Sequence, residues 1–389
     1  MPYLAFASNF TWVMVIGLLG PSVPKIIEDL QISYAQAGLF FTMLALGSLF
    51  GTTLTGIASD YLNRKVLFGM VALILAIGLA SMGLAASYLV VLLIILGYSL
   101  FGSPAGTVGQ SIMLSMFPDR RERYISLQTS FAALGSFTAP LLVALNFTVG
   151  LSWRWTFIEA GGLALLLFVW ILIVPIPRST GRMISRKNLS RILGNPRILF
   201  SALLIFLSVA PDLGFSYWLA EHFKTELGVP LGLSSAVVGV FLVGMITGRL
   251  LTSRLLKRFA SARILKAGLG LSLVALVVFL SVPWIPLKLG SLVLYGLGTA
   301  PVFPLLMARG TALYPDQPGT VSGVLFGSVS LGGMAFPLLL GAVAATVGIR
   351  LTYILVGVII LGLLLTVIAT QKWWERLSSA AEPATPVSP

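Results

Sequence analysis

An acidic residue inside an apolar stretch is the feature of this sequence most able to do chemistry. Asp212 lies between FLSVAP and LGFSYW, and a carboxylate within a membrane-spanning helix costs about 2.5 to 3.5 kcal/mol on insertion scales. It must therefore face a cavity, meet a partner or carry a proton. Ser208 and Ser216 are one helical turn away on either side, and Tyr217 and Trp218 follow. The pattern predicts a substrate or proton site, and the alternative is a structural acid paired with an arginine or a backbone group.

Polar and aromatic side chains of two other apolar stretches are candidates for the same site. Asn9 and Trp12 lie near the N-terminus, and Thr107 and Gln110 lie in a later stretch. Hydroxyls, amides and flat aromatic faces are what a neutral sugar requires for binding. Hydroxyl and amide side chains also join helices inside membranes, so both roles remain open. An anionic substrate is disfavoured because few basic residues fall at midplane depth.

The composition shows which elements must position these residues. Of 389 residues, 57% are hydrophobic and 10% are charged, whereas soluble domains carry about 25% charged residues. Stretches of about 20 apolar residues cross a bilayer as helices, and segments that are apolar all round exclude a barrel of alternating strands. The fold class predicted is an all-α membrane protein with twelve transmembrane helices in two six-helix bundles. The spans are expected at about 4–26, 36–59, 66–86, 89–115, 124–149, 155–176, 198–221, 233–255, 264–282, 285–310, 319–346 and 349–371.

The basic residues are distributed unevenly between the two sides of these spans. Twenty of the 25 lysines and arginines fall on one side, together with both termini. Cytoplasmic loops carry such an excess, which predicts a multi-pass protein of the plasma (inner) membrane with both termini in the cytoplasm. The net charge of +13 then serves orientation, and no nucleic-acid partner is expected. The five basic residues on the other side are Lys25, Arg154, Lys224, Lys288 and Arg350.

An internal repeat divides the chain into two halves. Glycine, proline and aspartate residues match at a constant offset of 197 positions, which indicates a duplication. The pairs include Gly47 with Gly244, Pro104 with Pro301, Asp119 with Asp316, Gly135 with Gly332, and Pro140 with Pro337. We expect an N-terminal bundle over 1–177, a basic cytoplasmic linker over 178–197, a C-terminal bundle over 198–372 and a polar tail over 373–389. Two halves in a parallel repeat are typical of transporters that alternate access around a midplane site.

Several classes of chemistry find no support in the residues. There are no cysteines and one histidine, so no metal site is expected. Neither a nucleotide-binding glycine loop nor a catalytic constellation occurs, which predicts a protein without cofactors that is not an enzyme. The expected partners are a small-molecule substrate, protons (with sodium as the alternative coupling ion) and the lipid bilayer, and the expected state is a monomer.

One connection carries a recognisable signature. GIASDYLNRK at 56–65 resembles the cytoplasmic motif of the major facilitator superfamily, and Gly56, Asp60, Arg64 and Lys65 match it. The resemblance implies a cytoplasmic charge cluster that locks the two halves in one state, although plain orientation by positive charge is the alternative. Arg249 lies in the corresponding segment of the second half and is assigned to the same gate. Its side chain either extends to the cytoplasm or is a buried partner for an acid.

Other segments are similar to one branch of that superfamily. GTAPVFPLLMARG at 298–310 and DLGFSYWLAEH at 212–222 resemble the tenth and seventh spans of fucose and glucose proton symporters. The resemblance implies proton-coupled symport of a sugar or another small neutral polar solute by alternating access. The alternative is a proton antiporter that exports drug-like or lipid-like amphipathic compounds. The paired residues Gly135, Pro140, Gly332 and Pro337 are expected at hinges or close helix contacts.

Overall fold

The computed structural model describes residues 2–61, 63–116, 121–176, 194–313 and 318–371. Within these residues there are twelve helical spans long and apolar enough to cross a membrane, and no strand. The predicted fold class is therefore confirmed. The helices of the N-terminal half are α1 Pro2–Leu30, α2 Tyr34–Tyr61, α3 Arg64–Ser81, the short η1 Met82–Leu84, α4 Tyr88–Gly102, α5 Pro104–Met116, α6 Arg121–Thr148 and α7 Trp153–Ile173.

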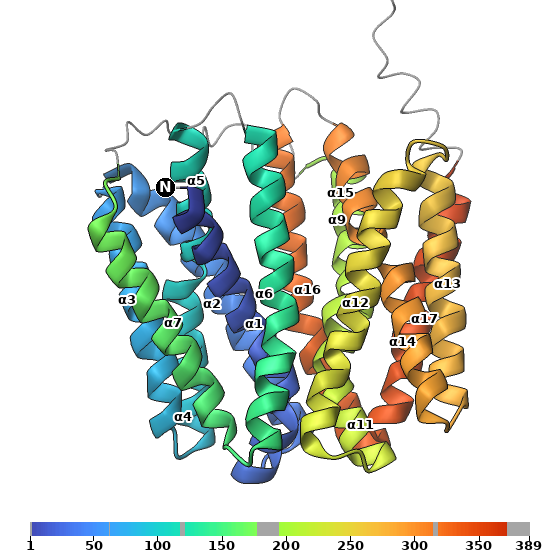
Figure 1. The fold of residues 1–389 in the computed structure, drawn as a ribbon. Helices are drawn as coiled ribbons and strands as arrows, with labels where there is room; N and C mark the ends of the chain where they lie inside the picture. The colour runs from blue at the N-terminus through green and yellow to red at the C-terminus, as the bar shows by residue number, and fades with distance from the viewer. Residues whose placement is uncertain (1, 62, 117–120, 177–193, 314–317, 372–389) are drawn as a thin grey trace, which may run out of the picture.

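The C-terminal half repeats this order. Its helices are α9 Pro196–Val209, η3 Ala210–Gly214, α10 Phe215–Tyr217, α11 Leu219–Leu227, α12 Leu231–Leu255, α13 Ser261–Ser281, α14 Ile285–Thr299, α15 Val302–Ala312, α16 Pro318–Val347 and α17 Ile349–Ala369. The helix α1 begins and α17 ends at the same end of the molecule, which we call the terminal face; α11 lies at the other end, the opposite face (Figure 1).

Equivalent prolines break one span in each half. In the fourth span α4 ends at Gly102 and α5 begins at Pro104; in the tenth, α14 ends at Thr299 and Pro301 precedes α15. A proline lacks the N–H that would continue the helical ladder, and its ring clashes with the preceding turn. Both prolines occupy equivalent positions of the duplication, so the break is inherited by each half.

Helix packing also repeats at the offset of 197. A Cβ atom on Gly47 of α2 would lie 2.8 Å from the carbonyl oxygen of Leu96 in α4. The equivalent Gly244 of α12 lies against the carbonyl of Val293 in α14, where a Cβ atom would overlap that oxygen. Glycine is required at both positions because the facing backbone cannot move aside as a side chain could.

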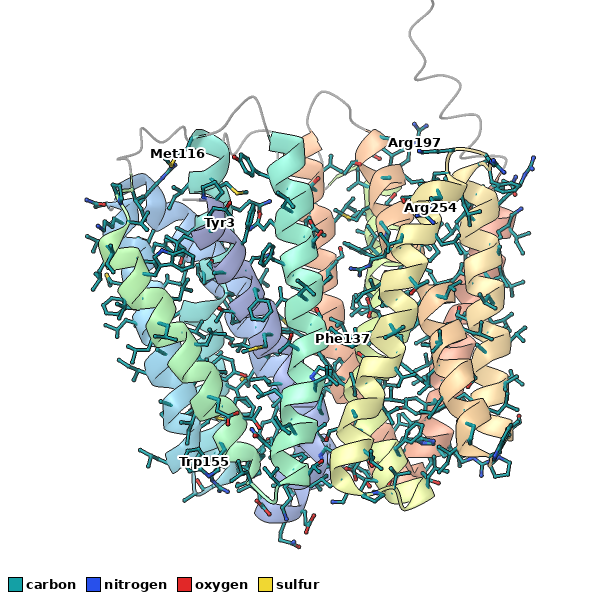
Figure 2. The ribbon with its side chains drawn as sticks, in the orientation of Figure 1. Tyr3, Met116, Phe137, Trp155, Arg197 and Arg254 are labelled. Carbon is teal, nitrogen blue, oxygen red and sulfur yellow. The ribbon has the colours of Figure 1, made fainter. Side chains whose placement is uncertain are left out.

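The outer surface of the molecule is apolar, as lipid contact requires. Leu166, Ile173 and Val358 are more than half exposed on the perimeter. Arg197 and Arg254 lie near the terminal face, and Phe137 lies at mid-height (Figure 2). This is an integral membrane protein, in which apolar side chains cover the outside and charged ones gather toward the ends.

Candidate functional site

The seventh span changes its helical geometry at Pro211. Because proline has no N–H to donate, the regular ladder ends after α9, and η3 continues as a turn of π-helix. The N–H of Phe215 bonds to the carbonyl of Ala210, five residues back. The carbonyl of Pro211 instead accepts a hydrogen bond from the hydroxyl of Tyr295, at 2.8 Å. Such π-helical turns are often found at functional sites.

This wide turn sets which side chains face the space between the halves. Asp212, Ser216 and Tyr217 line a cavity of about 220 Å³. Ser208 was expected on the same face, but it does not line the cavity, and its hydroxyl donates to the carbonyl of Ile205 at 2.7 Å. The four-residue spacing holds only along a regular helix, and one extra residue per turn changes the angular position of everything before it.

The cavity has one charged residue of each sign and a mainly apolar wall. The guanidinium of Arg249 faces the same cavity as the carboxyl of Asp212 and attracts it, but no ion pair joins these two described residues. The N-terminal half contributes α1 and α6, including Ser136 and Pro140. The apolar part of the wall includes Val13, Ile16, Ala133, Leu213, Val238, Phe241, Leu242, Met245 and Ile246. The arrangement can hold a small solute and a proton on a single carboxyl group.

The two aromatic candidates of the seventh span have different positions. The Tyr217 ring stacks on Phe41 of α2, with centroids 4.1 Å apart, and so closes the cavity between the halves. The indole N–H of Trp218 donates to the carbonyl of Pro337 at 3.2 Å, and its ring meets the edge of Tyr34. Trp218 therefore packs behind the cavity wall, against α2 and α16.

The N-terminal candidates lie apart from Asp212. Asn9 donates from Nδ2 to the carbonyl of Gln128 at 3.2 Å, and Trp12 is buried beside Gly102. These contacts join α1 to α4 and α6, and neither residue lines the cavity. Gln110 is half-buried in α5, and the side chain of Thr107 lies outside the described residues. The role predicted for them in binding stays a prediction.

The described residues include only part of the predicted cytoplasmic gate. Gly56 and Asp60 belong to the last turns of α2, and the side chain of Asp60 lies outside the described residues. Arg64 and Lys65 begin α3, where the ammonium of Lys65 donates to the carbonyl of Leu172 in α7 at 2.7 Å. That contact joins two helices of the same half, so the locking role stays a prediction.

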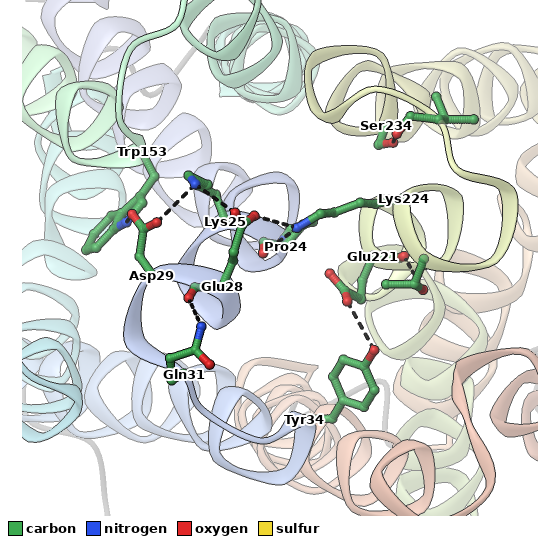
Figure 3. A network of polar contacts seen from close by, with 12 residues as sticks. Pro24, Lys25, Glu28, Asp29, Gln31, Tyr34, Trp153, Glu221, Lys224 and Ser234 are labelled. Carbon is green, nitrogen blue, oxygen red and sulfur yellow. Dashed lines mark hydrogen bonds and ion pairs between the residues drawn. The ribbon is translucent and has the colours of Figure 1, made fainter.

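A charged network at the opposite face joins the halves, and sequence reasoning missed it (Figure 3). Lys224 of α11 pairs with Glu28 of α1 at 2.9 Å and donates to the carbonyl of Pro24 at 3.2 Å. The hydroxyl of Tyr34 donates to Glu221 at 3.1 Å. Burial raises the pKa of Glu221, and the nearby Lys224 and the Tyr34 hydroxyl partly offset this. The acids at the ends of the first and seventh spans were the available signal in the sequence.

Comparisons with known proteins agree with this architecture. The family model described as Major Facilitator Superfamily matches residues 5–337 and 215–386. The chain belongs to the major facilitator superfamily. It is 24% identical to "Uncharacterized transporter y4wD" of Sinorhizobium fredii over 88% of this chain and 91% of that one. It is 30% identical to "Sodium-dependent glucose transporter 1A" of Mus musculus, over 34% of this chain and 31% of that one.

The solved structure of "nucleoside transporter NupG" has the same fold. Its TM-score is 0.76 at 16% identity, with 95% of this chain and 98% of that chain covered. Membership of this family makes the protein a transporter, and its two-bundle architecture is consistent with secondary transport.

Two of the predicted hinge residues, Gly135 and Gly332, each form a close helix contact within their own half of this major facilitator protein. A Cβ atom on Gly135 of α6 would lie 2.5 Å from the carbonyl of Phe10 in α1, and one on Gly332 of α16 would lie 2.9 Å from that of Phe206 in α9. Pro140 lines the cavity between the halves, whereas Gly135 contacts α1 of its own half.

Proposed function

We propose that this transporter is a proton-coupled symporter of a sugar or another small neutral polar solute, working by alternating access around Asp212. The observation that carries the proposal is the position of Asp212. Among the described residues that line the cavity between the halves, it is the only acid. Its neighbours Ser216, Tyr217 and Ser136 offer hydroxyl groups to a polar solute.

The apolar wall explains how a proton would be coupled to movement. An ionised carboxylate enclosed among apolar side chains is costly unless it is paired or protonated. Asp212 has no ion pair within the described structure, so closing both ends of the cavity requires a proton on Asp212 or a closer approach of Arg249. Proton binding and release thereby determine when the halves can rock.

The contacts between halves support a specific stage of the cycle. Lys224, Tyr34 and Phe41 all take part in contacts that join the halves toward the opposite face. Arg249 lies on the terminal-face side of the cavity and is exposed. With both termini in the cytoplasm of an inner-membrane monomer, as the charge distribution favours, this would be an inward-facing state. The cytoplasmic cluster of Gly56, Asp60, Arg64 and Lys65 would then close in the other state.

Proton antiport of an amphipathic compound is a second candidate, favoured by the mainly apolar wall of the cavity. A thermal-shift screen of the purified protein with hexoses, nucleosides and lipophilic cations identifies a ligand. Proteoliposomes loaded with a pH dye then separate the two mechanisms. Symport predicts that adding a stabilising hexose or nucleoside acidifies the lumen as protons enter with the solute. Stabilisation by lipophilic cations alone, with proton movement in the opposite direction to the cation, would replace the symport proposal by antiport.

A further inference from the structure

A second pocket lies at the opposite face, within the C-terminal half and away from Asp212. It has a volume of about 320 Å³, and its lining includes His222, Glu226, Lys288 and Arg350. These residues come from α11, the beginning of α14 and the beginning of α17, and the end of α13 completes the wall. The transport cycle proposed above uses none of them.

The two cations of this pocket are held in place by backbone carbonyls rather than by acids. Lys288 is 4% exposed; its ammonium donates to the carbonyl of Phe279 and lies 4.7 Å from the centre of the Phe279 ring. The Arg350 guanidinium donates to the carbonyl of Leu280 at 2.9 Å. Both carbonyls belong to the last turn of α13, whose ladder leaves them without N–H partners. Each cation uses one N–H donor for this hydrogen bond and has other N–H donors available.

The histidine of the pocket lacks a hydrogen-bond partner. His222 is 1% exposed, and neither ring nitrogen bonds to any described residue. Burial, with the charges of Lys288 and Arg350, lowers the pKa of His222 to about 3. Its imidazole is therefore neutral and presents one N–H donor. Buried polar groups almost always have a hydrogen-bond partner, and a group without one destabilises the fold.

The duplication places a counterpart of this pocket in the N-terminal half, and we call the two regions the C-terminal and N-terminal corners. Their comparison shows that, among the described residues, the C-terminal corner lacks a paired acid. At the offset of 197, His222 corresponds to Lys25, Glu226 to Asp29 and Arg350 to Trp153. In the N-terminal corner the Asp29 carboxylate accepts from the Trp153 indole at 3.0 Å and pairs with Lys25 at 3.1 Å. It also pairs with Arg154 at 3.7 Å.

In the C-terminal corner the equivalent acid does not fill the space. Glu226 is exposed and forms no ion pair with Lys288 or Arg350 in the described structure. Lys288 adds a cation whose N-terminal counterpart is Val91, an apolar residue. With a neutral His222, the pocket holds two positive charges and one negative charge, so a singly charged anion would neutralise it.

We propose that this pocket binds a phosphate group, as the headgroup of an anionic phospholipid or as inorganic phosphate. The Lys288 ammonium, the Arg350 guanidinium and the His222 N–H supply donors from three helices, as a tetrahedral oxyanion requires. The pocket lies where three spans end, which is the level of lipid headgroups in a bilayer. Binding would fasten α11, which carries Lys224, to the rest of its half.

Thermal unfolding of the purified, delipidated protein tests this site. The probes are inorganic phosphate, with chloride at equal ionic strength, and micelles containing phosphatidylglycerol, with phosphatidylcholine as the neutral comparison. We expect one of the two phosphate probes to raise the unfolding midpoint, with an apparent affinity at least tenfold weaker in His222→Phe and in Lys288→Met. His222→Phe is the decisive variant because it removes no hydrogen bond, whereas Lys288→Met also removes a helix cap. Arg154→Met, in the equivalent corner, should keep the full response.

The probes separate the two sources of the phosphate group. A response to phosphatidylglycerol alone identifies a lipid headgroup, and a response to inorganic phosphate at millimolar concentration identifies the free anion. The proposal is overturned if neither probe stabilises the protein, or if His222→Phe responds as the unchanged protein does. Because no solute is transported in this assay, its result is independent of the symport proposal.

Discussion

One methyl group added at Gly38 should drive the protein out of its present conformation. Gly38 of α2 faces α16 of the other half, where a Cβ atom would lie 2.9 Å from the Cα of Leu338 and 3.0 Å from the carbonyl of Pro337. Both are backbone atoms that cannot rotate away. Overpacking of this kind costs about 1 to 3 kcal/mol. The methyl group costs nothing once the halves part at the opposite face, so the equilibrium should shift by about 5-fold to 150-fold.

Cysteine labelling measures this shift directly, because the chain contains no cysteine. In Val13→Cys the single thiol lines the central cavity, and a membrane-impermeant maleimide added from either side reports access. Adding Gly38→Ala should increase the labelling rate from the opposite face and decrease it from the terminal face. Gly327→Ala in α16 is the matched control, since no atom lies within 4 Å of the added Cβ. Unchanged rates in Gly38→Ala, or equal changes in both variants, would refute the reasoning.

Changes at three other positions give separate predictions. Burial holds the pKa of His222 at about 3, below about 6.5 in the unfolded chain; stability should therefore fall by about 2 kcal/mol from pH 6.5 to pH 5. In His222→Gln this dependence should vanish in pH-dependent unfolding, and its persistence would exclude the histidine as its cause. Lys224→Met removes the partly exposed pair with Glu28, worth at most about 1 kcal/mol. It should raise the labelling rate of Val13→Cys from the opposite face by up to about fivefold. Adding Glu28→Gln should not raise this rate further, and a further increase would show that the two residues act separately. Tyr295→Phe leaves the buried Pro211 carbonyl without its 2.8 Å hydrogen bond, so the protein should lose about 1 to 3 kcal/mol in thermal unfolding; an unchanged midpoint would mean that the π-turn does not depend on this bond.

The helices of this protein could be predicted from sequence because they depend on local composition. A run of about 20 apolar residues has few alternatives to a helix in a bilayer. The duplication likewise predicted that Pro104 and Pro301 would have equivalent positions, and both break a span. The depth of Asp212 followed from its neighbours in the chain, and it does face the cavity between the halves.

The arrangement of the site depended on features that no local pattern contains. The π-helical turn at Ala210–Gly214 shifts the angular position of the residues that precede it in the seventh span. Ser208 therefore does not lie on the face that regular helical spacing predicted. Asn9 and Trp12 carry suitable groups, but the docking of α1 on α4 and α6 turns them into packing contacts. The pair of Lys224 and Glu28 joins residues 196 positions apart, and only the docking of the halves brings them together.

The central claim is that the proton bound by Asp212 drives accumulation of the solute. The direct measurement is uptake of the ligand found by thermal shift into proteoliposomes under an imposed pH gradient, comparing the unchanged protein with Asp212→Asn. Glu159→Gln is the matched control, because Glu159 is also an acid within a span but accepts from Asn146 at 2.7 Å and lies outside the cavity. The account predicts that Asp212→Asn only equilibrates the ligand, while Glu159→Gln still concentrates it. Full uphill accumulation by Asp212→Asn would contradict the account.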